Sequence, residues 1–126
     1  MRVLIVEDDE NRLLWFRSRL IGTVYDATKD VEEAKRLIEE NEYTQIFLDH
    51  DLADEHYAVW GERTTRHDET TGYAVARYLA EHPDRSKDAE IIIHSLNPIG
   101  SERMLNKLKE TRTNAKRVSY LELRNR

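Results

Sequence analysis

Three short apolar runs, each followed at once by acidic or polar residues, constrain the fold of this chain more than any other feature. The runs are V-L-I-V at residues 3–6, I-F-L at 46–48 and I-I-I at 91–93. Unbroken runs of this length, rich in β-branched residues, are typical of strands buried on both faces of a parallel sheet. They are far shorter than the roughly 20 apolar residues that cross a membrane, so no membrane partner is expected.

Segments in which apolar residues recur at helical spacing lie between these runs. Helices are predicted over 11–21, about 31–40, 71–81 and about 101–111, the last capped by Ser101. Two weaker strands are predicted over 23–27 and 118–123. Alternating strands and helices favour parallel strands joined by right-handed crossovers. The predicted fold class is therefore α/β: a flavodoxin-like, doubly wound parallel sheet of five strands.

The 126 residues suit one domain, so residues 1–126 are expected to form a single domain. A polar stretch at about 53–70 shows no periodicity, and we expect an inserted loop there. The chain contains no cysteine, which excludes disulfides, thiolate-bound metals and thiol nucleophiles. It opens without a signal peptide, and a cytoplasmic location is expected.

The net charge of −5 is distributed unevenly along the chain. Residues 1–100 carry 12 basic and 22 acidic side chains, a balance of −10, whereas residues 101–126 carry 8 and 3, a balance of +5. This division fits a metal site beside an anion-binding surface, and it equally fits a solvated basic helix at the end of the chain.

Acidic residues gather where the predicted strands end. Asp8 and Asp9 follow the first run, and the triplet Asp49, His50, Asp51 follows the second. In a flavodoxin-like strand order these two ends are neighbours. Crowded carboxylates repel one another and favour a bound hard cation such as Mg²⁺ or Mn²⁺. The alternative is that these acids only cap helix N-termini, where negative charge is stabilising.

The motifs V-L-I-V-E-D-D-E-N at 3–11 and I-F-L-D at 46–49 resemble the receiver domain of response regulators. The resemblance implies that Asp8 and Asp9 bind a metal together with Asp49, which in receivers accepts a phosphoryl group. It also implies that Ser95 matches the hydroxyl residue after the fourth strand. Two features depart from that family: no lysine follows the predicted fifth strand, and little sequence is left for the last helix, which should be short or missing.

A narrower resemblance rests on L-D-H-D-L at 48–52, T-G-Y at 71–73 and H-S-L-N-P-I-G-S-E-R-M at 94–104. These segments are similar to the family of cyclic-phosphate-processing receiver domains. The resemblance implies a metal-dependent phosphoesterase whose partner is a phosphate-containing small molecule or an RNA end, with no DNA-binding domain. Two alternatives stay open. One is a stand-alone receiver phosphorylated on Asp49, and the other is a non-catalytic, partner-binding relic.

Metal-assisted cleavage of a phosphodiester needs a nucleophile and a proton donor for the leaving oxygen. The candidate catalytic residues are Asp49, His94, Asp51 and His50. Because neighbouring strand residues point to opposite faces, Asp49, Asp51 and His94 are favoured over His50. The alternative for each histidine is a local hydrogen bond at a strand end.

A phosphate-binding turn is expected after the fourth predicted strand. Its candidate residues are Ser95, Asn97, Gly100, Ser101 and Arg103. Glycine allows close approach of the backbone, a helix start presents free N–H groups, and arginine binds phosphate in a bidentate manner. An ordinary capped helix is the alternative interpretation of this segment.

Overall fold

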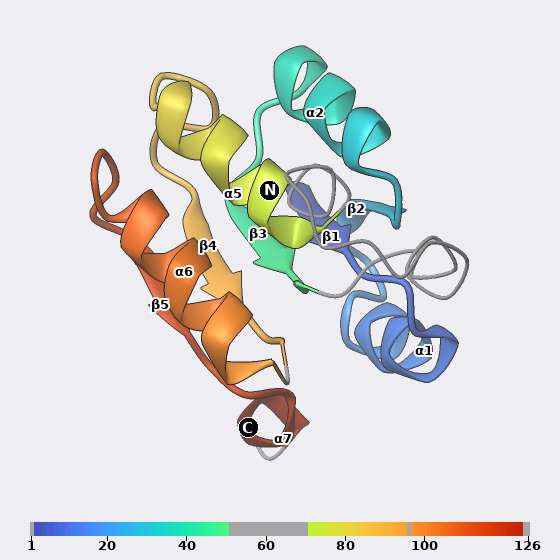
Figure 1. The fold of residues 1–126 in the computed structure, drawn as a ribbon. Coiled ribbons are helices and arrows are strands. Elements are labelled where there is room, and N and C mark those ends of the chain that lie inside the picture. The colour runs from blue at the N-terminus through green and yellow to red at the C-terminus, as the bar shows by residue number, and fades with distance from the viewer. Residues whose placement is uncertain (1, 51–70, 96, 125–126) are drawn as a thin grey trace.

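A five-stranded parallel sheet forms the centre of the molecule in a computed structural model, which describes residues 2–50, 71–95 and 97–124 (Figure 1). The strands are β1 (Arg2–Val6), β2 (Val24–Thr28), β3 (Gln45–Leu48), β4 (Glu90–Ile93) and β5 (Ala115–Arg117). The helices are α1 (Glu10–Arg19), α2 (Val31–Glu40), α5 (Gly72–Glu81), α6 (Pro98–Leu108) and α7 (Tyr120–Arg124).

The strand order is β2-β1-β3-β4-β5, and every pair of neighbours is parallel. This is the flavodoxin-like order, so the predicted fold class is confirmed. The last helix, α7, is short, as expected. The expected loop at 53–70 lies outside the described residues. No helix in the described part of the chain has both the length and the apolar character of a membrane-spanning segment.

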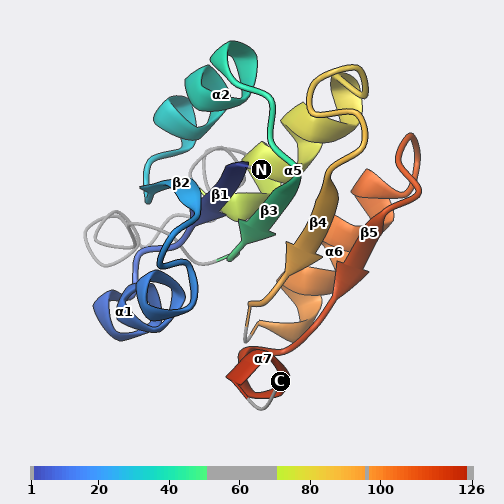
Figure 2. The ribbon, with the colours of Figure 1, turned by 180° about the vertical axis from the view of Figure 1, so that it is seen from behind.

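Alternation along the strands divides the core into two layers. Leu4 and Val6 of β1 pack with α2, α5 and α6 on one face of the sheet, which these helices cover in Figure 1. Val3 and Ile5 pack on the other face with Phe16 of α1 and with residues from the end of the chain. Figure 2 shows the strands from behind, where α2, α5 and α6 do not cover them. The face to which a strand residue points therefore decides which helices it meets.

The predicted strand over 118–123 is wrong. The fifth strand is the shorter segment β5, and residues 120–124 form α7. Ser119 and Glu122 explain the helix because each caps the other: Glu122 N–H donates to Ser119 Oγ (3.1 Å), and Ser119 N–H donates to the Glu122 carboxylate (3.2 Å). This reciprocal capping box has the sequence pattern S-x-x-E, which indicates a helix start.

The start of α6 also differs from the prediction. The helix begins at Pro98 and is capped by Asn97, whose side-chain oxygen accepts the Gly100 N–H at 2.9 Å. Proline suits the first helical position because its missing N–H would have no partner there. Ser101, the predicted cap, lies one turn inside the helix and is fully buried.

Arg112 closes the C-terminal end of α5 from a distant part of the chain. Its guanidinium donates to the carbonyl oxygens of Leu79 (2.9 Å), His82 (2.9 Å) and Ser86 (3.0 Å), and also to that of Arg85. The side chain is buried. The last carbonyls of a helix have no partner within the helix, and the negative end of its dipole favours a cation.

Replacing Arg112 with Met should destabilise the fold, because the buried carbonyls lose their donors while the apolar stem is kept. The free energy of unfolding should fall by about 2–4 kcal/mol, the range for stranding several buried acceptors. Urea denaturation followed by circular dichroism measures it. Arg36→Met, which removes the same charge from an exposed position on α2, should change the free energy by less than about 0.5 kcal/mol. Equal effects of both changes would contradict the assignment.

Candidate functional site

Glu7, Asp49 and His94 form a row across three neighbouring strands. The parallel register aligns Val6 with Leu48 and Leu48 with Ile93. Each residue of the row comes directly after one of these aligned residues. The ladder continues into the row, because Asp49 N–H donates to the Val6 carbonyl and His94 N–H donates to the Leu48 carbonyl, both at 3.0 Å. The carboxyl ends of the strands thus bring together two acids and a histidine.

Glu7 lies at the β1 end of this row and is fully buried. Its Oε2 accepts the backbone N–H groups of Asp8 and Asp9, each at 3.0 Å. Arg12 donates through Nε to Oε1 (2.9 Å) and through Nη2 to Oε2 (3.0 Å), and His94 Nε2 lies 2.7 Å from Oε1. Burial alone would raise the pKa of Glu7, but the hydrogen bonds from His94 and Arg12 lower it to about 2. Glu7 is therefore a carboxylate.

Asp49 is also buried, with 2% of its surface exposed, and its environment differs. Its Oδ1 accepts the His50 backbone N–H at 2.9 Å, and its Oδ2 lies 3.3 Å from Arg12 Nη2. Burial and the negative charge of Glu7 raise the pKa of Asp49 to about 8, and Arg12 offsets this only in part. A second negative charge beside Glu7 is therefore unfavourable, because Arg12 compensates it only in part.

Three carboxylates in this place fit a divalent cation. Glu7, Asp8 and Asp49 each offer an oxygen atom, and these atoms lie within 4.8 Å of one another. Oxygen ligands are those that Mg²⁺ prefers. Asp9, expected from the sequence among the ligands, instead caps α1 by accepting the Arg12 backbone N–H at 2.9 Å. Glu7 stands in its place in the cluster.

His94 contacts Glu7 from the interior of the protein and is not exposed at the surface. Its ring packs edge-on against Phe16 and Phe47, with centroids 5.2 and 6.4 Å away, and its side chain is fully buried. Nε2 is the nitrogen that meets Glu7, and Nδ1 has no hydrogen-bond partner among the described residues. In this arrangement His94 orients Glu7.

His50 points to the opposite face of the sheet, toward α6. A Cβ added to Gly100 would lie 2.5 Å from the His50 ring, and one added to Gly72 would lie 1.8 Å from the Asp49 carbonyl oxygen. Gly72 N–H donates to the His50 carbonyl at 2.8 Å. Both glycines are thus required for close packing of α5 and α6 on the end of β3. Gly100, expected to make room for a ligand, makes room for His50.

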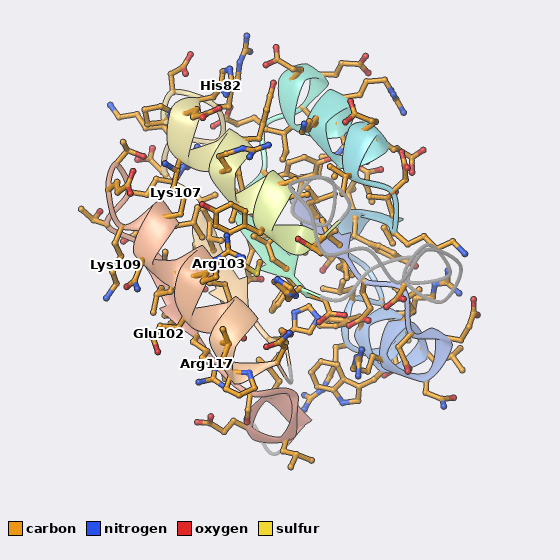
Figure 3. All side chains as sticks on the ribbon, in the orientation of Figure 1. His82, Glu102, Arg103, Lys107, Lys109 and Arg117 are labelled. Carbon is orange, nitrogen blue, oxygen red and sulfur yellow. The ribbon has the colours of Figure 1, made fainter. Side chains whose placement is uncertain are left out.

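The predicted phosphate turn is only partly assembled. Ser95 and Asn97 lie together at the end of β4, where Asn97 N–H donates to Ser95 Oγ at 3.1 Å. Ser101 is buried and donates to the Ser95 carbonyl at 3.4 Å. Arg103 lies over the ring of Tyr73 at 4.4 Å, between α6 and α5 (Figure 3). Asp51 lies outside the described residues.

Two residues of the site were missed by sequence reasoning. Glu7 was identifiable because the alternation Val3, Ile5, Glu7 places it on the α1 face, in register with Asp49. Arg12 could not be identified in this way, because its position in the sequence does not distinguish a site residue from an exposed arginine on a helix.

Solved structures similar to this one are receiver domains. A sensor histidine kinase receiver domain from Pseudomonas aeruginosa, solved with magnesium in its active-site cleft, has a TM-score of 0.64, 19% identity, and coverage of 98% of this chain and 91% of its own. A Saccharomyces cerevisiae receiver domain in complex with a histidine phosphotransfer protein scores 0.64 at 17% identity, covering 99% and 83%. A Thermotoga maritima response regulator in complex with Mg²⁺ and beryllium fluoride scores 0.59 at 22% identity, covering 98% and 93%.

These likenesses define the class by its fold: a receiver domain. The family is narrower, because the family model described as "Cyclic-phosphate processing Receiver domain" matches residues 3–110. The chain belongs to this family, and the resemblance stated from its motifs is confirmed. A comparison with curated proteins finds no match.

Replacing Asp49 with Asn should stabilise the metal-free protein at alkaline pH. The folded-state pKa of Asp49, about 8, lies above its ordinary value of 3.8, so ionisation of this group opposes folding. Its contribution to stability is complete below pH 4 and is lost as the pH rises toward 8. Asn resembles the protonated acid, and at pH 8 the variant should be more stable by at least about 1 kcal/mol, or roughly one pKa unit.

Urea denaturation in the presence of a chelator, between pH 4 and 9, measures this difference. The gap between Asp49→Asn and the unchanged protein should open as the pH rises. Asp88→Asn removes an exposed charge just before β4, at the other end of the strand, and should show a small gap that varies little with pH. A variant less stable than the unchanged protein at pH 8 would contradict the prediction.

Proposed function

We propose that this protein is a metal-dependent phosphoesterase that acts on a cyclic phosphate, in a nucleotide or at an RNA end. The observation that carries the proposal is the convergence of Glu7, Asp8 and Asp49 at the ends of β1 and β3. The family to which the chain belongs, described as cyclic-phosphate processing, supports the substrate class. Three acids repel a phosphate, so the chemistry requires a cation between them and the substrate.

The same three acids are assigned to Mg²⁺ or Mn²⁺. When bound there, the cation would neutralise phosphate oxygens and lower the pKa of a bound water. His94 and Arg12 hold Glu7 in position through the hydrogen bonds described above. Asp9 supports the arrangement indirectly, by capping the helix that carries Arg12.

Ser95 and Asn97 are assigned to the substrate phosphate, since they lie at the end of β4 where the positive end of the α6 dipole begins. Gly100 and Ser101 support this turn through packing, and Arg103, which lies over the Tyr73 ring, is a further proposed phosphate ligand.

The reaction consumes one water molecule. The water oxygen forms a bond to phosphorus, one P–O bond of the ring breaks, and a proton moves to the released alkoxide to give a phosphate monoester. Both histidines are buried, and His50 is assigned to this proton because its Nδ1 lies 3.5 Å from Asn97 Nδ2, beside the proposed phosphate ligands, whereas His94 is bonded to Glu7. Asp51, the next residue in the chain, is its proposed helper.

The second candidate is a stand-alone receiver phosphorylated on Asp49. It is favoured by the position of Asp49 at the carboxyl end of β3, and a structural neighbour was solved with a phosphotransfer protein. The residues after β5 count against it. The resemblance to receiver domains implies a lysine after this strand, whereas here Val118 and Ser119 follow β5 and Ser119 caps α7. Lys116, within β5, is turned to Glu90 at 2.8 Å.

Incubation with 2′,3′-cyclic nucleotides should give phosphate monoesters only when Mg²⁺ or Mn²⁺ is present. Asp8→Asn and Asp49→Asn should each lower turnover by about 100-fold or more, the effect of losing one strong electrostatic contact with reacting charge. Chromatography of the nucleotide products measures this. Asp88→Asn should retain turnover, because its carboxylate is exposed and precedes β4.

Acetyl phosphate tests the second candidate on the same samples. A stable gain of one phosphoryl mass that disappears in Asp49→Asn, with no nucleotide turnover, would establish the receiver and overturn the phosphoesterase. No activity in either assay would leave the non-catalytic, partner-binding domain.

A further inference from the structure

One cation already lies among the acids of the site: the guanidinium of Arg12. It makes two charge-assisted hydrogen bonds to Glu7, at 2.9 and 3.0 Å, and a third contact to Asp49 at 3.3 Å. Hydrogen bonds of this kind are among the strongest in proteins. The pairing raises the pKa of Arg12 above its usual range, so the side chain stays charged.

The place of Arg12 in α1 makes this contact unusual. It lies in the first turn of the helix, where its backbone N–H donates to the Asp9 cap. The positive end of a helix dipole disfavours a cation in that turn. The side chain is therefore held there by its contacts with Glu7 and Asp49.

Glu7 has no acceptor capacity left while Arg12 is in place. Two donors meet Oε1 and three meet Oε2. A metal ligated by Glu7 must replace one of them. The N–H groups of Asp8 and Asp9 belong to the backbone, and His94 is packed against two aromatic rings. Arg12 is a flexible side chain with 19% of its surface exposed, so it is the donor that can move.

We propose that Arg12 is the internal counter-ion of the acidic pocket, and that a divalent cation binds by displacing its guanidinium from Glu7 and Asp49. The inference rests on the proposed function, because it assigns the metal to the same acids. It adds a competition: the site is occupied by one cation or the other, and Arg12 sets the metal concentration at which they exchange.

Removing the Arg12 charge should tighten metal binding. Arg12→Gln should bind Mn²⁺ at least about 10-fold more tightly than the unchanged protein, within the range typical of coupling between ligands. Electron paramagnetic resonance of free Mn²⁺ measures the dissociation constants. Arg19→Gln removes the same charge from the last turn of α1, where Arg19 lies over Trp15 at 5.0 Å, and should shift the affinity less than twofold.

Two further measurements keep the test valid if Arg12→Gln fails to fold without metal. Arg12→Lys keeps a charge but loses the forked contact, and its Mn²⁺ affinity should lie between those of the Gln variant and the unchanged protein. In the unchanged protein, the ¹⁵N–¹H signal of Arg12 Nε should shift during titration with Mg²⁺ as its bond to Glu7 is lost.

The outcomes separate this inference from the proposed function. Metal binding that leaves the Arg12 Nε signal unchanged, or that weakens in Arg12→Gln, would overturn the competition and leave the metal-dependent function intact. Binding by Arg12→Gln but not by the unchanged protein would support the competition in its strongest form. Absence of binding in every variant would overturn both.

Discussion

A fully buried carboxylate, Glu7, is the constraint on which the site depends. An ion in a protein interior is stable only when hydrogen bonds and opposite charge replace its hydration. Here the backbone after β1, the ring of His94 and the fork of Arg12 supply them. Each of these groups is thereby held in place, so the geometry of the first helix, the end of β4 and Asp49 all follow from one desolvated charge.

The two faces of the sheet carry different groups of site residues. On the α1 face, Glu7, Asp49 and His94 form a polar row, and Phe16 and Phe47 pack against His94. On the other face, Gly72 and Gly100 allow the starts of α5 and α6 to pack closely against Asp49 and His50 at the end of β3. Under the proposed function, a cation would bind to the first arrangement and a phosphate would approach the second, and the two would meet at the edge of the sheet.

The fold could be predicted well from the sequence because buried parallel strands are recognisable as unbroken apolar runs. The order of the strands follows from the helical connections between them. The prediction failed at 118–123, where six residues with two buried apolar side chains fit a strand or a helix, and only the Ser119–Glu122 capping box distinguished the two. In the site, Asp8 and Asp49 were identifiable as acids at strand ends. Choosing Glu7 instead of Asp9 as a member of the acidic cluster required attention to the alternation of side chains between the two faces of the sheet. Identifying Arg12 as a site residue required the three-dimensional structure.

The Arg112 contacts have a consequence for how the domain holds together as a unit. A guanidinium shared among carbonyls of residues 79–86 exists only when the segment after α6 and the end of α5 are both in place. Neither can open without stranding the polar groups of the other. The short edge strand that begins three residues later is therefore not an independently fraying element, and the β4–β5 side of the sheet gains and loses its order cooperatively with α5.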